Sequence, residues 1–248
     1  MNEIISVKGL RKIYHTPKQE IFAVDNFSFR VFDGDFISIV GPSGCGKSTI
    51  LSILVGIEEK SGGKIEIADD IKIGYMPQDD ALFEWLNVLD NCLLPLKIKH
   101  VLTKERKEYV IKLLKKYGLG SFLNSYPQNL SGGMRQRVSL IRTLATNPDV
   151  IFVDEPFSAL DYQSRLILSD DVYRIIKNEG KSAVMVTHSI EEAVTMSDTV
   201  IVLSKRPCTI KKIIQIKRKE NKLPTENRKD ENYGYYYDMI WKELDLHD

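Results

Sequence analysis

Residues Gly41–Thr49, with the sequence GPSGCGKST, form the clearest arrangement for chemistry in the chain. Glycine at the first and sixth positions, lysine at the seventh and serine at the eighth are the fixed positions of a phosphate-binding loop. The glycines allow successive backbone N–H groups to converge on phosphate oxygens, and the following helix N-terminus adds a partial positive charge. Lys47 supplies a full positive charge, and the hydroxyl of Ser48 is placed to ligate Mg²⁺.

We therefore expect this whole segment to bind a nucleoside triphosphate through Gly41, Pro42, Ser43, Gly44, Cys45, Gly46, Lys47, Ser48 and Thr49. One alternative is a glycine-rich turn that binds nothing. At Cys45, a redox sensor is the alternative to a small residue at a variable position of the motif.

Two adjacent carboxylates follow a second apolar run. Val150–Val153 reads as a buried strand, and Asp154 and Glu155 come directly after it. Ligands bind at the carboxyl ends of strands in open parallel sheets, so Asp154 is expected to hold the Mg²⁺ shell. Glu155 is expected to act as the general base that polarises water for attack on the terminal phosphate. The alternative is a solvated turn.

A second potential anion site lies in the sequence NLSGGMRQR. Ser131 is a natural N-cap for the helical pattern that follows, and the N–H groups of Gly132 and Gly133 remain available at the helix start. One chain does not need two such sites for one nucleotide. Two copies placed head to tail would let the Ser131 turn of one close over the terminal phosphate bound by Lys47 of the other, so the motif predicts a dimer.

Several strands must position these groups. Apolar runs without alternation at Phe36–Val40, Val150–Val153 and Ala183–Val186 predict strands buried on both faces of a parallel sheet. Alternating patterns at Phe27–Val31 and Lys64–Ile67 predict half-buried strands of an antiparallel layer.

Capping residues predict where helices begin and end. A helix is expected from the N-cap Thr103 to Tyr117, with Gly118 as its stop signal. Another is expected after Ser189, which has capping-box spacing to Glu192. An amphipathic C-terminal helix from Tyr233 to Leu244 is expected behind a polar linker at 217–231.

Length and composition limit the remaining possibilities. The 248 residues are 43% hydrophobic, which suits one large α/β domain or two closely packed lobes. The formal net charge of +1 gives no basic field for nucleic acid. Three cysteines, an odd number, predict a reducing compartment. No signal peptide or membrane-spanning run is apparent, so we expect a cytosolic protein or one attached to a membrane through partners.

Taken together, these motifs resemble those of the ATP-binding subunits of ABC transporters, over nearly the whole chain. The matching segments, in the family's order, are GPSGCGKST (41–49), LSGGMRQ (130–136), VIFVDEP (150–156), SALD (158–161) and VTHS (186–189). The resemblance implies an α/β P-loop NTPase of the ABC ATPase type, a mixed β core with an antiparallel β layer plus a small α-helical subdomain. It implies one ABC ATPase domain over 1–248: a nucleotide-binding core lobe (1–78 and 147–216), a helical signature lobe (79–146), and a linker with a C-terminal helix (217–248).

The resemblance also implies roles for four further residues. Gln78 would sense Mg²⁺ and the γ-phosphate, and His188 would orient the attacking water together with Glu155. Asp161 would lie in the loop that crosses the dimer seam, and Tyr14 would stack on adenine. The implied cofactors are ATP and Mg²⁺, with Ser48, Gln78 and Asp154 at the metal.

The function implied by this resemblance is uptake of a small solute. A homodimer, or a pair with a different ATPase subunit, would act on permease subunits and an extracytoplasmic solute-binding protein, at the cytoplasmic face of the membrane and without nucleic acid. Segment 81–86 is expected to accept a short permease helix, with core packing as the alternative. The segments 85–91 and 197–210 look most like the nitrate, sulfonate, taurine and pyrimidine-precursor importers. The rivals are a soluble ABC-type ATPase acting on DNA or ribosomes and an ordinary P-loop kinase.

Overall fold

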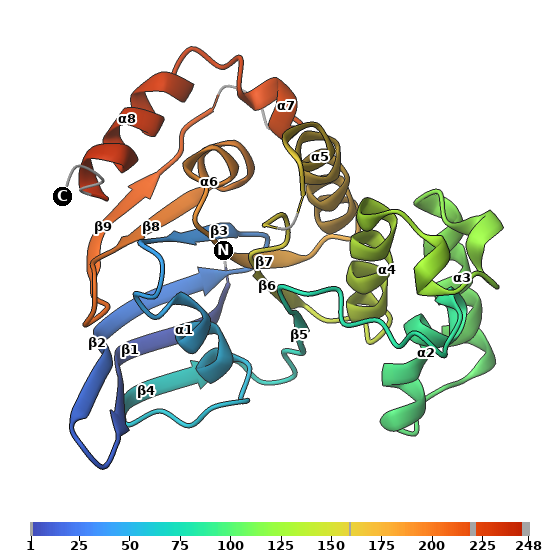
Figure 1. Ribbon diagram of the computed structural model, residues 1–248, viewed down its shortest axis with the longest axis horizontal. Coiled ribbons are helices and arrows are strands. Elements are labelled where there is room, and N and C mark those ends of the chain that lie inside the picture. The colour runs from blue at the N-terminus through green and yellow to red at the C-terminus, as the bar shows by residue number, and fades with distance from the viewer. Residues whose placement is uncertain (1, 159, 219–221, 245–248) are drawn as a thin grey trace.

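The computed structural model describes residues 2–158, 160–218 and 222–244. A mixed sheet runs through the middle of the molecule, with helices above it and a second, antiparallel sheet below it (Figure 1). The strand order of the central sheet is β5-β6-β7-β3-β8-β9. Its strands are β3 (Phe36–Val40), β5 (Ile73–Met76), β6 (Val150–Asp154), β7 (Ser182–Thr187), β8 (Thr199–Leu203) and β9 (Ile210–Gln215).

The strands of this sheet are parallel except β9, which pairs antiparallel with β8. Alternate residues of the buried strands serve two cores. In β6, Phe152 packs into the core shared with the antiparallel sheet, whereas Ile151 and Val153 pack into the core under the helices. The prediction of strands buried on both faces is confirmed, and each such side chain contributes about 1.5–3 kcal/mol on burial.

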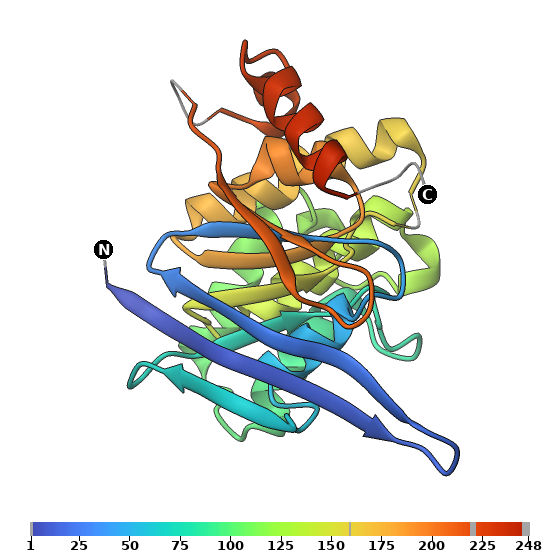
Figure 2. The same ribbon diagram turned by 90° about the vertical axis from the view of Figure 1, so that its left-hand side faces the viewer.

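The antiparallel layer has the strand order β2-β1-β4 and lies below the central sheet (Figure 2). Its strands are β1 (Glu3–His15), β2 (Glu20–Phe32) and β4 (Gly62–Ile67). Helix α1 (Lys47–Leu54) packs against β2, β6 and β7, and Gly56, just past its C-cap Val55, has a φ of 78° that suits glycine. The predicted antiparallel layer is therefore present.

Helices α2 (Val88–Ile98) and α3 (Lys104–Lys116) lie to one side of the sheets, and α4 (Gly132–Leu144) joins them to the core (Figure 1). The Thr103 hydroxyl accepts a hydrogen bond from the Arg106 N–H, and Gly118 after the helix has a φ of 77°. Both ends of α3 are as the sequence predicted. The division of the chain into lobes stays a prediction.

The upper face of the central sheet is covered by α5 (Tyr162–Asn178), α6 (Ile190–Met196) and α8 (Tyr233–Glu243). Ile240 and Leu244 pack with α6, β8 and β9, so the amphipathic C-terminal helix is present. The polar segment 217–231, predicted as a linker, contains the short helix α7 (Pro224–Asn227) in its described part. Thr225 of α7 anchors it on α5, because its N–H and hydroxyl both donate to Asp170.

In the described part of the chain, no helix combines the length and the apolar character that crossing a bilayer requires.

Candidate nucleotide-binding and hydrolysis site

Four parallel strands end at one edge of the central sheet, and each leads into a predicted site segment. β3 is followed by Gly41, β5 by Gln78 after one residue, β6 by Glu155 and β7 by His188. The strands are paired in register, so their carboxyl ends lie side by side. This is the edge at which open α/β sheets bind ligands.

The loop after β3 adopts backbone conformations that glycine favours. Gly44 has a φ of 70° and Gly46 a φ of 127°. A Cβ at Gly46 would also lie 3.1 Å from the carbonyl oxygen of Ala23. The loop then enters α1 at Lys47, so the N–H groups of the first turn of the helix lie next to it.

Lys47 extends its ammonium group into this loop. Its Nζ donates to the carbonyl oxygens of Gly41 at 2.9 Å and Pro42 at 3.0 Å, and lies 3.9 Å from Oε1 of Glu155. The side chain is buried, at 5% exposure. A buried full charge here can bind phosphate oxygens with little screening by water.

Ser48 and Asp154 face each other across the same edge. The Ser48 hydroxyl donates to Oδ1 of Asp154 at 3.3 Å. Burial raises the pKa of Asp154, while the hydrogen bond from Ser48 acts in the opposite direction. One carboxylate and one hydroxyl are oxygen donors, and Mg²⁺ in nucleotide sites is commonly bound by one or two such groups with phosphates and water. These residues therefore fit Mg²⁺.

Glu155 and His188 form the second contact pair. His188 Nδ1 lies 3.1 Å from Oε2 of Glu155. Glu155 has a φ of 39°, an uncommon conformation for a residue other than glycine. Its N–H donates to the carbonyl of Val186, and its own carbonyl accepts from the Ser158 hydroxyl. Strain retained by surrounding hydrogen bonds is typical of functional residues.

Gln78 reaches this pair indirectly. Its Nε2 donates to the Ser158 hydroxyl at 3.2 Å, and Ser158 bonds to the Glu155 carbonyl. The sequence did not single out the hydroxyl of Ser158, although Ser158 begins the SALD motif.

Tyr14 lies beside the end of the loop. Its hydroxyl donates to Glu58 at 2.9 Å and lies 3.4 Å from the Thr49 hydroxyl. The ammonium of Lys12 is 4.8 Å from the ring centroid. Burial raises the pKa of Tyr14, so the phenol stays neutral. The ring is therefore near the loop, while its contact with adenine stays a prediction.

Ser131 and Asp161 cap helices at other places in the fold. The Ser131 hydroxyl accepts from the Met134 N–H at 3.3 Å, and Asp161 Oδ1 accepts from the Ser164 N–H at 3.0 Å. Within the described residues, none of these side-chain hydrogen bonds reaches the loop at 41–49. Gly132 and Gly133, in the first turn of α4, keep N–H groups that the helix itself does not use.

Sequence reasoning missed the loop at 206–208, whose side chains contact the phosphate-binding loop at Gly44 and Cys45. Arg206 Nη2 donates to the Gly44 carbonyl at 2.7 Å, and the Cys208 thiol hydrogen-bonds to Cys45. That bond, together with the charge of Lys47, lowers the pKa of Cys45 to about 7, although burial opposes the shift. Arg206 is 162 residues from Gly44 in sequence, and no local pattern indicates these partners.

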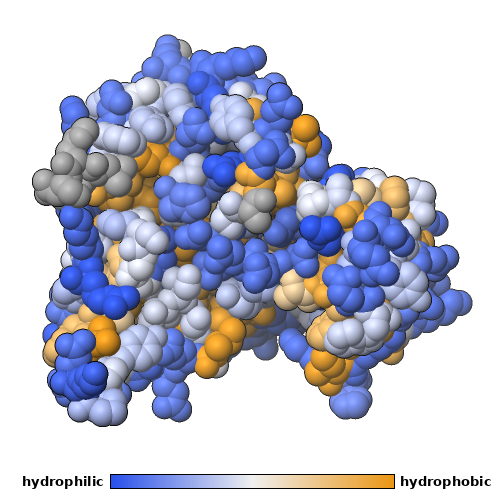
Figure 3. All heavy atoms as spheres, in the orientation of Figure 1, coloured by the Kyte–Doolittle hydropathy of each residue, from blue (hydrophilic) through white to orange (hydrophobic). Residues whose placement is uncertain are grey.

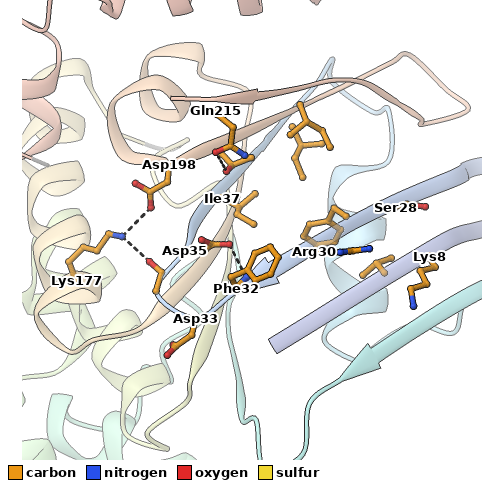
Figure 4. A pocket seen from close by; sticks show the side chains of 16 residues that line it. Lys8, Ser28, Arg30, Phe32, Asp33, Asp35, Ile37, Lys177, Asp198 and Gln215 are labelled. Atoms are coloured by element: carbon orange, nitrogen blue, oxygen red, sulfur yellow. Dashed lines mark hydrogen bonds and ion pairs between the residues drawn. The ribbon is translucent and has the colours of Figure 1, made fainter. Parts of the chain in front are cut away.

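A wide hollow of 920 Å³ lies away from this edge, between the start of β3 and the antiparallel sheet (Figure 4). Lys177 points into it and donates to Asp198 at 3.2 Å and to the Gly34 carbonyl at 3.1 Å. Lys177 forms an ion pair with Asp198 there, and the hollow contains none of the predicted site residues. We therefore assign the chemistry to the sheet edge.

The fold and this edge define a P-loop ATPase. Residues 24–158 match the family described as ABC transporter, and the chain belongs to this family. It is 45% identical over 247 residues to "Uncharacterized ABC transporter ATP-binding protein YtlC" of Bacillus subtilis, covering 97% of this chain and 95% of that one. It is 34% identical over 226 residues to "Aliphatic sulfonates import ATP-binding protein SsuB" of Bacillus cereus, covering 89% and 87%.

A solved structure of an ATP-binding cassette has the same fold. The dimeric post-hydrolysis state of the ATP-binding cassette MJ0796 bound to ADP and phosphate superposes with a TM-score of 0.73 at 30% identity. The match covers 87% of this chain and all of that one. The chain is thus an ATP-binding ABC ATPase with the fold class that its sequence predicted.

Proposed function

We propose that two copies of this chain enclose two ATP molecules head to tail and drive the uptake of a small solute through a membrane permease. The observation that carries this proposal is the separation of the site into two halves. Lys47, Asp154, Glu155 and His188 belong to one sheet edge, whereas Ser131 caps α4 and, among the described residues, makes no side-chain hydrogen bond to that edge. A second chain would supply the missing half.

Each residue has a role in this proposal. Lys47 and the loop N–H groups bind the phosphates, and Ser48, Asp154 and Gln78 would hold Mg²⁺, which would neutralise phosphate charge. Glu155 accepts a proton from the attacking water, and His188 positions that water and the γ-phosphate. Tyr14 stacks on adenine. Ser131, Gly132, Gly133 and Asp161 act from the partner subunit's side of the seam.

ATP does work here by preferring one arrangement of the dimer. A ligand shifts an equilibrium only by its different affinity for two states. ATP bridges Lys47 of one copy and Ser131 of the other only in the closed dimer, and hydrolysis removes the bridge. Changing the population from 1% to 99% closed requires about 5.5 kcal/mol of preference, which two nucleotides share.

The permease would dock on the helical side of the molecule. Trp85 is 73% exposed and Phe83 38%, and their rings pack 5.0 Å apart, centroid to centroid. Apolar side chains also gather on this side in Figure 3, at the lower right where α2 lies in Figure 1. Ile98 and Leu102 are exposed there as well. Contiguous patches of exposed apolar groups mark interaction sites.

The sulfonate-import relative and the segments 85–91 and 197–210 support an importer of the sulfonate and nitrate group. The chain would act at the cytoplasmic face as a peripheral subunit, with a solute-binding protein on the other side. The test is ATP-driven uptake in vesicles containing the purified complex, with alkanesulfonate, taurine, nitrate and a pyrimidine precursor as candidate solutes. Uptake of one solute that disappears with Glu155→Gln supports the proposal. Purification with nucleic acid and without any membrane partner would contradict it.

A further inference from the structure

Helices α5 and α6 begin at the two turns that the site depends on. Asp161 caps α5, and Ser189, directly after His188, caps α6. The helices lie side by side above the central sheet (Figure 1). In the first turn of each helix is one charged residue that faces the other helix, Arg165 in α5 and Glu192 in α6.

Glu192 does not complete the capping box that its spacing predicted. Its N–H donates to the Ser189 hydroxyl, but its carboxylate is buried and points back to β7. Thr187 donates its hydroxyl proton to Oε2 of Glu192 at 2.5 Å, and the same hydroxyl accepts from the Ser189 N–H at 3.0 Å. The carboxylate therefore fixes the residues on both sides of His188.

Arg165 connects that carboxylate to the other turn. Its Nη2 donates to the carbonyl of Leu160, the residue before Asp161, at 3.2 Å. Its Nε lies 3.8 Å from Oε1 of Glu192, within ion-pair distance but too far for a hydrogen bond. Among the described residues, this buried Nε has no hydrogen-bond partner. An unpaired buried donor costs free energy. An approach of about 1 Å between the two helices would let this donor form a hydrogen bond and would remove that cost.

We infer that Arg165 and Glu192 are positioning residues that couple the Asp161 turn at the seam to the orientation of His188. The inference rests on the proposed dimer, because closure of the seam is what displaces Asp161. Displacement of the first turn of α5 brings Arg165 Nε into hydrogen bonding with Glu192. Glu192 already accepts from Thr187, whose hydroxyl accepts from Ser189, and His188 between them already lies 3.1 Å from Glu155. The added hydrogen bond from Arg165 therefore locks His188 in this orientation when the seam closes.

A second contact keeps the two helices together on their outer side. Arg228, directly after α7, pairs with Glu191 of α6 at 3.2 Å and donates to the Tyr162 hydroxyl of α5 at 2.9 Å. Its guanidinium carbon also lies 5.7 Å from the centroid of the Tyr162 ring. This outer contact limits the separation of α5 and α6, so a movement of α5 reaches Glu192.

The test is a double-mutant cycle on the ATPase rate of the full chain. Glu192→Gln and Arg165→Lys are each expected to lower kcat by about 10- to 100-fold, because a catalytic group displaced by about 1 Å loses that much. KM for ATP should stay within about twofold, since neither residue contacts the phosphate loop. In a His188→Ala background, Glu192→Gln should lower kcat no further, because Glu192 acts through His188.

Lys177→Met is the matched control, because it removes an ion pair to Asp198 at the far end of the same helix α5. It should leave kcat unchanged. Glu192→Asp, which keeps the charge, serves if Glu192→Gln does not fold, and should recover part of the rate. Losses that multiply in the His188→Ala background, or a rise in KM with kcat preserved, would overturn the inference. Failure of the dimer itself would appear separately, as a Glu155→Gln chain that stays monomeric in ATP.

Discussion

Asp154 illustrates how a proposed metal-binding residue reduces stability. Burial raises its pKa, so the folded protein prefers the neutral carboxyl. The stabilising contribution of that preference is present below the unfolded pKa and is lost as the pH rises through the folded pKa. At neutral pH, the ionised carboxylate therefore makes the nucleotide-free protein less stable than a neutral isostere would.

We predict that Asp154→Asn raises the melting temperature of the nucleotide-free chain at pH 7 and abolishes the extra stabilisation that Mg²⁺-ATP gives. Each kcal/mol gained corresponds to about 2–4 °C for a domain of this size. The gain should shrink as the pH is lowered, because the wild-type carboxyl is then protonated. Calorimetry across pH measures both effects.

Asp90 is the matched control, because its pKa is shifted in the opposite direction. A hydrogen bond from Lys97 lowers its pKa, so its ionised form is preferred in the folded state. Asp90→Asn should not raise the melting temperature at pH 7. A destabilised Asp154→Asn chain at pH 7 would contradict the account of burial.

Substitutions of Tyr14 can distinguish stacking on adenine from hydrogen bonding by the hydroxyl. Its hydroxyl contacts Glu58 and Thr49, whereas stacking on adenine requires only the ring. We predict that Tyr14→Phe keeps the ATP affinity within about twofold. Tyr14→Ala should lose about 1–3 kcal/mol, or about 5- to 150-fold in Kd. Calorimetric titration would reject the role if Tyr14→Ala bound ATP as well as the wild type.

At this scale, sequence reasoning reached the residues whose type and spacing are set by a local motif. Lys47, Ser48, Asp154 and Glu155 belong to short motifs that follow or end buried strands, so the sequence could predict that they meet at one sheet edge. Other contacts could not be predicted. Ser158 bonds to Gln78, which is 80 residues away, and Arg206 bonds to Gly44 across 162 residues. Such contacts exist only after distant strands have paired.

Among the secondary-structure elements, α4 combines a structural cap with a proposed binding turn. The Ser131 hydroxyl caps the helix, and loss of such a cap costs about 0.5–2 kcal/mol. We predict that Ser131→Ala lowers stability by this amount and also weakens ATP-dependent association. Denaturant unfolding and sedimentation measure the two effects.

Thr103 provides the comparison, because it caps α3 in the same way, at the same 3.3 Å distance. Thr103→Ala should lower stability similarly and leave association unchanged. If both variants dimerised equally well in ATP, the Ser131 turn would have no special part in the seam.

Elements with strong local signals were predicted, and elements stabilised by their neighbours were not. Thr103, Ser131 and Gly118 gave the ends of α3 and the start of α4 because cap chemistry is local. β5 has four residues and exists because it pairs with β6. α7 also has four residues, and its Thr225 and Asn227 are fixed by α5 and α6.

For the whole molecule, the exposed pair Phe83 and Trp85 predicts where the ATPase contacts the permease. Trp85→Ala should abolish stimulation of ATPase activity by the permease without changing the ATPase rate of the isolated chain. Trp85 is exposed and outside the nucleotide site, so its removal costs little stability. Tyr235→Ala, at a 63% exposed aromatic on α8, is the control and should leave the permease response intact. A normal response of the Trp85 variant in the reconstituted complex would place the docking surface elsewhere.

The central claim is that ATP is bound between two chains, each supplying half of the site. The most direct measurement is the mass of the Glu155→Gln chain by sedimentation equilibrium, with and without saturating Mg²⁺-ATP. The account predicts a monomer without nucleotide and twice that mass with ATP, and a monomer again when Ser131→Arg is added. A Glu155→Gln chain that binds ATP fully and yet remains monomeric, alone and with its membrane partners, would contradict the account.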